Sequence, residues 1–150
     1  MTTRAAIDDF LKQKTLAIIG VSRGGKKFGN ACYKELKAHG YRLFPVNPNA
    51  ETIQGERCYP NLGALPQPVD AVLLIVPPVE TEKVVKDIAS SGIQRVWMQR
   101  GAASEKAIRF CEENGIQVVH GECILMYAEP LVFFHKMHRF VHKLLGKMPK

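Results

Sequence analysis

The sequence of 150 residues lacks the features that mark several large classes of protein. Its apolar runs are far shorter than the roughly 20 residues that cross a bilayer, and the opening segment MTTRAAIDDFLKQK contains no apolar stretch of signal-peptide length. Its four cysteines form no C-x-x-C pair, which argues against a zinc knuckle and against a redox dithiol. We therefore expect a cytoplasmic protein with reduced thiols, no metal site and no membrane partner.

Nucleic-acid binding is also disfavoured, although the net charge is +7. Much of the positive excess lies between His135 and Lys150, and no aromatic residues interleave with basic ones as in an RNA-binding sheet. A final helix from Pro130 to Leu145 is expected to present a basic face to solvent. Its opposite, apolar stripe suits contact with the core or with a second copy of the chain, so a homo-oligomer through this helix is a candidate arrangement.

Apolar runs alternate with helix-like segments along the chain, which predicts a doubly wound parallel sheet. Helices are expected near residues 30–39, 79–91 and 104–114, each ended by a glycine, with Phe28, Cys32 and Leu36 sharing one apolar face of the first. We predict one Rossmann-like α/β domain over residues 1–150, with three layers and flanking helices at Arg4–Leu11 and Pro130–Leu145. The proline-rich stretch 60–68 is expected to be a loop with room for a short helical turn. The expected strands are Leu16–Gly20, Tyr41–Val46, Ala71–Val76, Arg95–Met98 and Gln117–His120.

A glycine-rich, basic junction follows the first expected strand. Gly20 permits a tight exit from the strand, and the next glycines would let the backbone approach a ligand closely. The helix that follows opens without an acidic residue, so its unpaired N–H groups would attract phosphate, whereas the next two helices open with glutamates that would repel it. This junction is therefore the predicted phosphate site. It contains Gly24, Gly25 and Gly29 and the cations Arg23, Lys26 and Lys27.

The motifs that accompany most NAD sites are missing. The first turn does not read G-x-G-x-x-G, and the second strand ends in Pro45-Val46-Asn47-Pro48 with no carboxylate to bond the ribose hydroxyls. A dinucleotide with a free ribose is therefore disfavoured, whereas a nucleotide with an additional phosphate suits an acid-free strand end. An NAD(P)-dependent oxidoreductase stays open as an alternative.

An ordered set of short motifs carries a family resemblance. The set consists of Gly20-Val21-Ser22, YRLFPVNPN at 41–49, Val76-Pro77-Pro78, WMQRG at 97–101 and GIQVVHGEC at 115–123. In this order the motifs resemble those of stand-alone proteins of the CoA-binding-domain family, which are related to the CoA-binding domain of the succinyl-CoA synthetase alpha subunit. That synthetase also needs a phosphorylated histidine on a second domain and a partner subunit.

The resemblance implies a Rossmann-like domain that binds coenzyme A or an acyl-CoA across the carboxyl ends of its strands, as a binding or regulatory module without catalysis of its own. By this analogy the residues near the diphosphate are Gly20, Val21, Ser22, Arg23 and Lys26; those around the adenosine are Asn47, Pro48, Pro77 and Pro78; and those toward the pantetheine arm are Gln99, Gly101 and Cys123.

Cys123 is the one candidate for catalysis. It is expected at the end of the fifth strand, where a thiolate could carry out acyl transfer or disulfide exchange if a nearby cation lowered its pKa. His120 and Arg100 are candidates for that cation by position. Inert packing is the competing interpretation of this cysteine. A Cys123-dependent acyl-transfer or redox enzyme is thus a further alternative.

Overall fold

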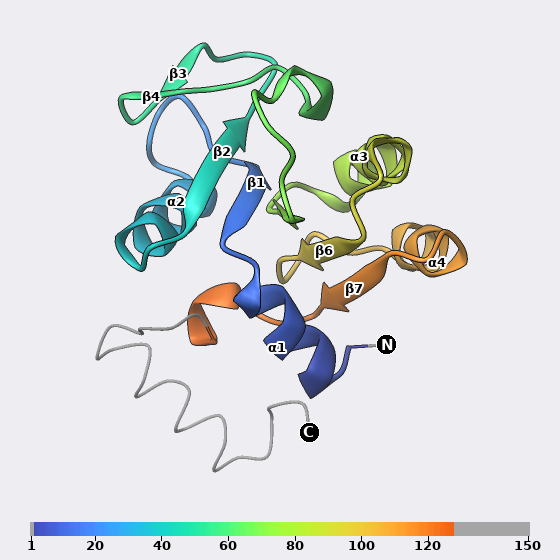
Figure 1. Cartoon of the computed structure of the whole chain (residues 1–150). Helices are drawn as coiled ribbons and strands as arrows, with labels where there is room; N and C mark the ends of the chain where they lie inside the picture. Colours follow the sequence, from blue (N-terminus) through green and yellow to red (C-terminus); the bar gives the residue numbers. More distant parts are fainter. Residues whose placement is uncertain (1, 128–150) are drawn as a thin grey trace.

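Five parallel strands form the centre of the molecule, and the computed structural model describes residues 2–127 (Figure 1). The strands run in the order β2-β1-β5-β6-β7, so the chain turns in opposite directions from β1 and β5. This arrangement confirms the predicted Rossmann-like, doubly wound sheet and places a switch point between the carboxyl ends of β1 and β5. The strands are β1 (Thr15–Ile19), β2 (Arg42–Val46), β5 (Ala71–Leu74), β6 (Arg95–Met98) and β7 (Gln117–His120).

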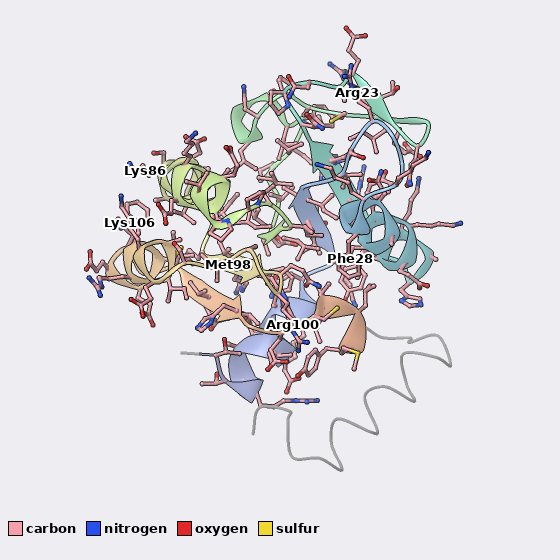
Figure 2. The ribbon with its side chains drawn as sticks, turned by 180° about the vertical axis from the view of Figure 1, so that it is seen from behind. Arg23, Phe28, Lys86, Met98, Arg100 and Lys106 are labelled. Carbon is pink, nitrogen blue, oxygen red and sulfur yellow. The ribbon has the colours of Figure 1, made fainter. Side chains whose placement is uncertain are left out.

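Helices cover both faces of the sheet and make the fold three-layered. Helices α1 (Arg4–Lys12) and α2 (Phe28–Ala38) pack on one face, and α3 (Pro78–Ser91) and α4 (Glu105–Glu113) pack on the other. Alternate strand residues supply the two cores, because Leu16 and Ile18 join the α1 and α2 side while Ala17 joins the α3 and α4 side. Lysines of α3 and α4 point to solvent, as Lys86 and Lys106 do in Figure 2.

The start of α2 differs from its expected packing. Phe28 does not share the buried face of Cys32 and Leu36, because it is the first residue of α2 and half of its surface is exposed. The final helix expected at Pro130–Leu145 lies outside the described residues. Within residues 2–127, no helix has the length and apolar character needed to cross a membrane.

The segment between β2 and β5 contains more structure than the predicted loop. A short antiparallel ribbon forms from β3 (Thr52–Ile53) and β4 (Glu56–Arg57), joined at Gln54 and Gly55, which both have positive φ. The predicted helical turn follows as η1 (Leu62–Ala64). Between them, Tyr59 pairs with the edge of β2, since its N–H donates to the carbonyl of Pro45 at 3.0 Å. The ribbon therefore lies beside the carboxyl end of β2.

Helix α2 approaches the end of β1 more closely than a side chain at the contact would allow. A Cβ added at Gly29 would overlap the carbonyl oxygen of Gly20, and one added at Gly20 would overlap the carbonyl oxygen of Ile75. Gly29 thus serves contact between helix and strand, whereas the sequence suggested approach to a ligand. By contrast, Gly24 and Gly25 have no close neighbours that a Cβ would meet.

Substituting the contact glycine should therefore separate α2 from β1. Gly29→Ala is expected to lower the free energy of unfolding by about 1–3 kcal/mol, because backbone must move to admit the methyl group. Gly24→Ala is the matched control, since its Cβ would have only Ser22 Oγ nearby, at 4.0 Å. Denaturant unfolding followed by the fluorescence of the single tryptophan, Trp97, measures both. Equal stability of the two variants would contradict this interpretation.

Candidate functional site

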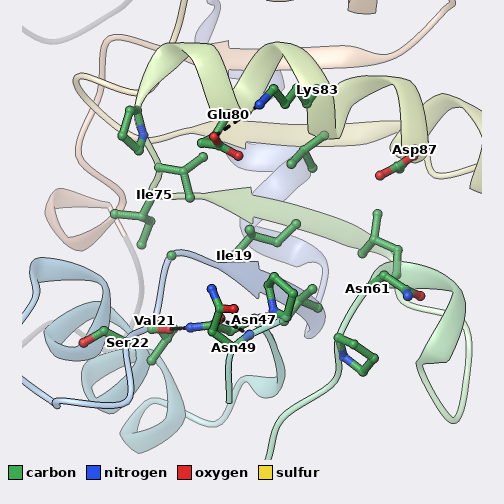
Figure 3. A pocket seen from close by; sticks show the side chains of 18 of the residues that line it. Ile19, Val21, Ser22, Asn47, Asn49, Asn61, Ile75, Glu80, Lys83 and Asp87 are labelled. Carbon is green, nitrogen blue, oxygen red and sulfur yellow. Dashed lines mark hydrogen bonds and ion pairs between the residues drawn. The ribbon is translucent and has the colours of Figure 1, made fainter. Parts of the chain in front are cut away.

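A pocket of about 510 Å³ lies at the carboxyl ends of β1, β2 and β5, beside the N-terminal half of α3. We call it the strand-end pocket. Its size is that of an ordinary small-ligand site, and its floor is formed by apolar residues that end these strands, such as Ile19, Val46 and Ile75. Figure 3 shows α3 on one side, with the loops after β1 and β2 on the other. The fold thus places the pocket at the switch point.

The chain that leaves β1 is held by two asparagines. Asn30, 2% exposed on α2, accepts hydrogen bonds through Oδ1 from the N–H and the hydroxyl of Ser22, both at 3.0 Å, and donates to the Ser22 carbonyl at 2.8 Å. From the other side, Asn47 Nδ2 donates to the carbonyl of Val21 at 3.1 Å. Asn47 also accepts from the N–H of Asn49, which forms a turn after β2. These hydrogen bonds therefore fix the path of the loop where it lines the strand-end pocket.

The two ends of the strand-end pocket differ in charge. At the β1 end, Lys27 lines the pocket and stands before α2, whose N-terminus has no side-chain cap and no acidic residue in its first turn. At the α3 side, Glu80 and Asp87 line the pocket together with Lys83, which lies 3.6 Å from Glu80. Because helix N-termini and lysines attract anions, a phosphate group is favoured at the Lys27 end and disfavoured near Asp87.

The predicted site residues separate into two groups. Gly20, Val21, Ser22, Asn47, Pro48 and Pro77 line the strand-end pocket. Arg23 lines a neighbouring pocket instead. Lys27, which belongs to the predicted phosphate site but is not one of the residues that the resemblance places near the diphosphate, lines the strand-end pocket, whereas Lys26 does not. The residues assigned to the pantetheine arm do not line this pocket, and neither does Pro78, the first residue of α3. Those arm residues are Gln99, Gly101 and Cys123.

Cys123 is fixed by a buried glutamine. Gln99, 2% exposed at the end of β6, donates from Nε2 to Cys123 Sγ at 3.0 Å and accepts from the N–H of Ile124 at 3.0 Å. Cys123 is half-buried, whereas the other three cysteines are buried. Burial raises the pKa of the Cys32 and Cys58 thiols and raises the pKa of Cys111 to about 11. These three thiols are therefore protonated and unreactive at neutral pH.

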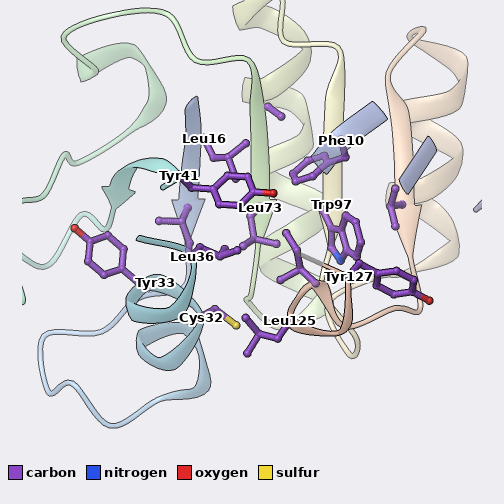
Figure 4. Close-up of a cluster of buried hydrophobic side chains, with 14 of the residues drawn as sticks. Phe10, Leu16, Cys32, Tyr33, Leu36, Tyr41, Leu73, Trp97, Leu125 and Tyr127 are labelled. Atoms are coloured by element: carbon purple, nitrogen blue, oxygen red, sulfur yellow. The ribbon is translucent and has the colours of Figure 1, made fainter. Parts of the chain in front are cut away.

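The predicted cation for Cys123 is not supplied by His120. Burial lowers the pKa of this imidazole, so it is largely uncharged at neutral pH. The neighbourhood is dominated by packing, as Cys32, Trp97, Leu125 and Tyr127 belong to one buried cluster (Figure 4). Trp97 also donates from its indole N–H to the carbonyl of Glu122 at 3.0 Å. Its side chain is fully buried in the core. Among residues 2–127, no three His, Cys, Asp or Glu side chains gather as metal ligands.

Asn30 is a residue of the candidate site that the sequence does not reveal. The sequence indicates only that a helix begins near it, and its hydrogen bonds depend on Ser22, eight positions earlier. A small polar residue buried in the first turn of a helix is unusual, because burial of an amide requires hydrogen-bond partners. That requirement was the one available signal, and burial of this position became clear only from the structure.

Removing the Asn30 side chain should loosen the loop. Asn30→Ala is expected to lower the free energy of unfolding by about 1–3 kcal/mol, because the Ser22 backbone loses both of its partners on Asn30. The control Asn49→Ala removes an exposed amide from the same pocket rim and should change stability by less than about 0.5 kcal/mol. Denaturant unfolding of both variants checks the difference, and an unchanged Asn30→Ala protein would count against the role assigned to this residue.

A family described as CoA binding domain matches residues 14–129. The chain is 25% identical over 129 residues to the alpha subunit of an ADP-forming acetate–CoA ligase II of Pyrococcus furiosus, and 32% identical over 106 residues to an ADP-forming acetate–CoA ligase II of Archaeoglobus fulgidus. These matches cover 79% and 69% of the chain but only 28% and 16% of the two ligases.

A small solved structure matches over nearly its whole length. It is a conserved hypothetical protein from Pyrococcus furiosus, with a TM-score of 0.71 and 37% identity, and the match covers 74% of this chain and 96% of that one. The described fold therefore occurs both as the greater part of a small protein and as a fraction of larger ligases.

Proposed function

The chain belongs to the CoA-binding domain family, and we propose that it binds coenzyme A or an acyl-CoA at the strand-end pocket. The observation that carries this proposal is the pairing of an apolar pocket with an uncapped, lysine-flanked helix N-terminus at its β1 end. CoA has matching parts, because an apolar base and a diphosphate are joined through one ribose. The donor set thus fits the ligand.

The proposed arrangement follows the two ends of the pocket. The diphosphate takes the loop Val21–Ser22, Lys27 and the first turn of α2, where N–H groups and a cation are available. The adenine takes the apolar part formed by the ends of β2 and β5, beside Pro48 and Pro77. The exocyclic amine of the base is then free to meet the acidic side of the pocket on α3. Asn30 and Asn47 act as positioning residues, since they hold the loop and need not touch the ligand.

We further propose a binding or regulatory module rather than an enzyme. Catalysis by the acetate–CoA ligases is a property of proteins several times longer than this match. The buried thiols have raised pKa values, and His120 is largely neutral, which supports a role for the Cys123 region in packing. The pantetheine arm is proposed to run from the β1 loop toward Gln99 and Gly101. CoA supplies its own thiol, so binding alone would place an acyl carrier at this edge of the sheet.

Calorimetric titration of ligand-stripped protein tests the proposal. CoA is expected to bind with a micromolar dissociation constant, and Lys27→Gln should weaken binding about fivefold, because roughly 1 kcal/mol of charge interaction with the diphosphate is lost. Lys86→Gln is the matched control, since Lys86 is exposed on α3 and does not line the pocket (Figure 2).

The same protein is also titrated with NAD and with NADP. Saturable binding of either dinucleotide with no response to CoA would overturn the proposal and favour an oxidoreductase. If Lys27→Gln and Lys86→Gln weakened CoA equally, the diphosphate would not lie at the start of α2.

A further inference from the structure

A second pocket adjoins the strand-end pocket beneath the β3–β4 ribbon, and we call it the ribbon pocket. The two pockets share Pro48, Asn49 and Pro60, so they adjoin at the turn that follows β2. Arg23, from the loop after β1, and Arg57, from β4, both line the ribbon pocket. Arg23 lies beside the ribbon in Figure 2.

Arg57 is brought to this position by contacts of its neighbours. The N–H of Cys58 donates to the carbonyl of Glu51 at 2.8 Å, and Cys58 Sγ lies 3.7 Å from the carbonyl oxygen of Asn47. On the other side, Glu56 pairs with Lys37 of α2 at 2.5 Å. The Arg57 guanidinium lies over the ring of Tyr59, 5.2 Å from its centroid, which restricts the side chain. The backbone of Arg57 is thus tied both to the β2 end and to α2.

The charges of the ribbon pocket favour an anion. Two guanidinium groups face one carboxylate, Glu51, and the hydroxyl of Thr52 adds a neutral donor. Within residues 2–127, neither Arg23 nor Arg57 forms an ion pair with a carboxylate. Guanidinium groups bind phosphate oxygens in a bidentate manner, so the pair suits a phosphate monoester better than it suits a carboxylate or a neutral sugar.

The shared rim relates this pocket to the ligand proposed above. A ribose at Pro48 and Asn49 would direct its base into the strand-end pocket and its 5′-diphosphate toward Lys27. Its 3′ position would then lie at the rim that the two pockets share, next to the ribbon pocket. We infer that the ribbon pocket receives the 3′-phosphate of CoA between Arg23 and Arg57. This inference rests on the proposed function and makes Arg57 a specificity-determining residue that discriminates CoA from 3′-dephospho-CoA.

Titration of wild-type protein and variants with CoA and 3′-dephospho-CoA tests the inference. Wild-type protein should prefer CoA by about tenfold or more, and Arg57→Gln should remove about tenfold of CoA affinity while changing 3′-dephospho-CoA less than about twofold. The matched control is Arg42→Gln, because Arg42 is also exposed and lies over an aromatic ring, that of Phe44, but does not line the ribbon pocket.

A second variant acts in the opposite direction. Glu51→Gln removes the carboxylate from the ribbon pocket. It should increase the affinity for CoA by about threefold and leave the affinity for 3′-dephospho-CoA unchanged. It keeps the inference falsifiable if Arg57→Gln does not fold, which Trp97 fluorescence would show.

The outcomes distinguish failure of the ribbon-pocket assignment from failure of the proposed CoA binding. The ribbon-pocket assignment would be overturned, with CoA binding itself unaffected, if Arg57→Gln lost affinity equally for CoA and 3′-dephospho-CoA. It would also be overturned if the wild-type protein showed no preference for CoA. Absence of CoA binding to the wild-type protein would overturn the proposed function and the inference together. A selective loss of affinity for CoA in Arg57→Gln, with unchanged affinity in Arg42→Gln, would establish the assignment.

Discussion

The close packing of α2 on the end of β1 is the constraint on which the site depends. Gly29 lies against the backbone of Gly20. The next residue of α2, Asn30, forms hydrogen bonds with the backbone of Ser22 and so fixes the loop that follows Gly20. A side chain at Gly29 would push the start of α2 away from the end of β1, and a side chain at Gly20 would collide with the carbonyl of Ile75 after β5. Because the field of a helix terminus falls off within about a turn, an anion-binding role requires this short distance. Packing and electrostatics are therefore set by the same few atoms.

The strand-end pocket also has a direction. Its β1 end offers a cation and a helix N-terminus without a side-chain cap, whereas its α3 side carries two carboxylates that are partly balanced by Lys83. A ligand with an anionic end and a neutral, hydrogen-bonding base would be oriented by this difference, because the reversed pose would bring phosphate against carboxylates. The ends of β1, β2 and β5 contribute no carboxylate to this pocket, in agreement with the acid-free end of the second strand in the sequence. Glu80 and Asp87 come instead from one face of α3, where a lysine at an intermediate position keeps the net charge low.

The sequence predicted the sheet well because each buried strand is a continuous apolar run and each helix ends at a glycine or polar cap. It also pointed to the loop after β1, because Gly20 is followed within one short segment by Arg23, Lys26 and Lys27, and part of this loop lines the strand-end pocket. Three features escaped it, because each depends on a detail of the folded backbone that the residue types alone do not specify. Asn30 acquires its role from Ser22, Lys27 is selected over Lys26 by the start of α2, and the β3–β4 ribbon forms through a Gln54-Gly55 turn that is less familiar than Asn-Gly.

The ribbon solves two physical problems with one segment. Strand β2 is at the edge of the sheet, and an unpaired edge invites pairing with another chain. The hydrogen bonds between Tyr59 and the end of β2 cover part of that edge, and Pro45 removes one donor from it. To reach this position the chain must first turn back over the Asn47–Asn49 turn, which brings Arg57 beside Arg23. Edge protection and the basic lining of the ribbon pocket are thus coupled, because a segment released from β2 would also withdraw its arginine from the site.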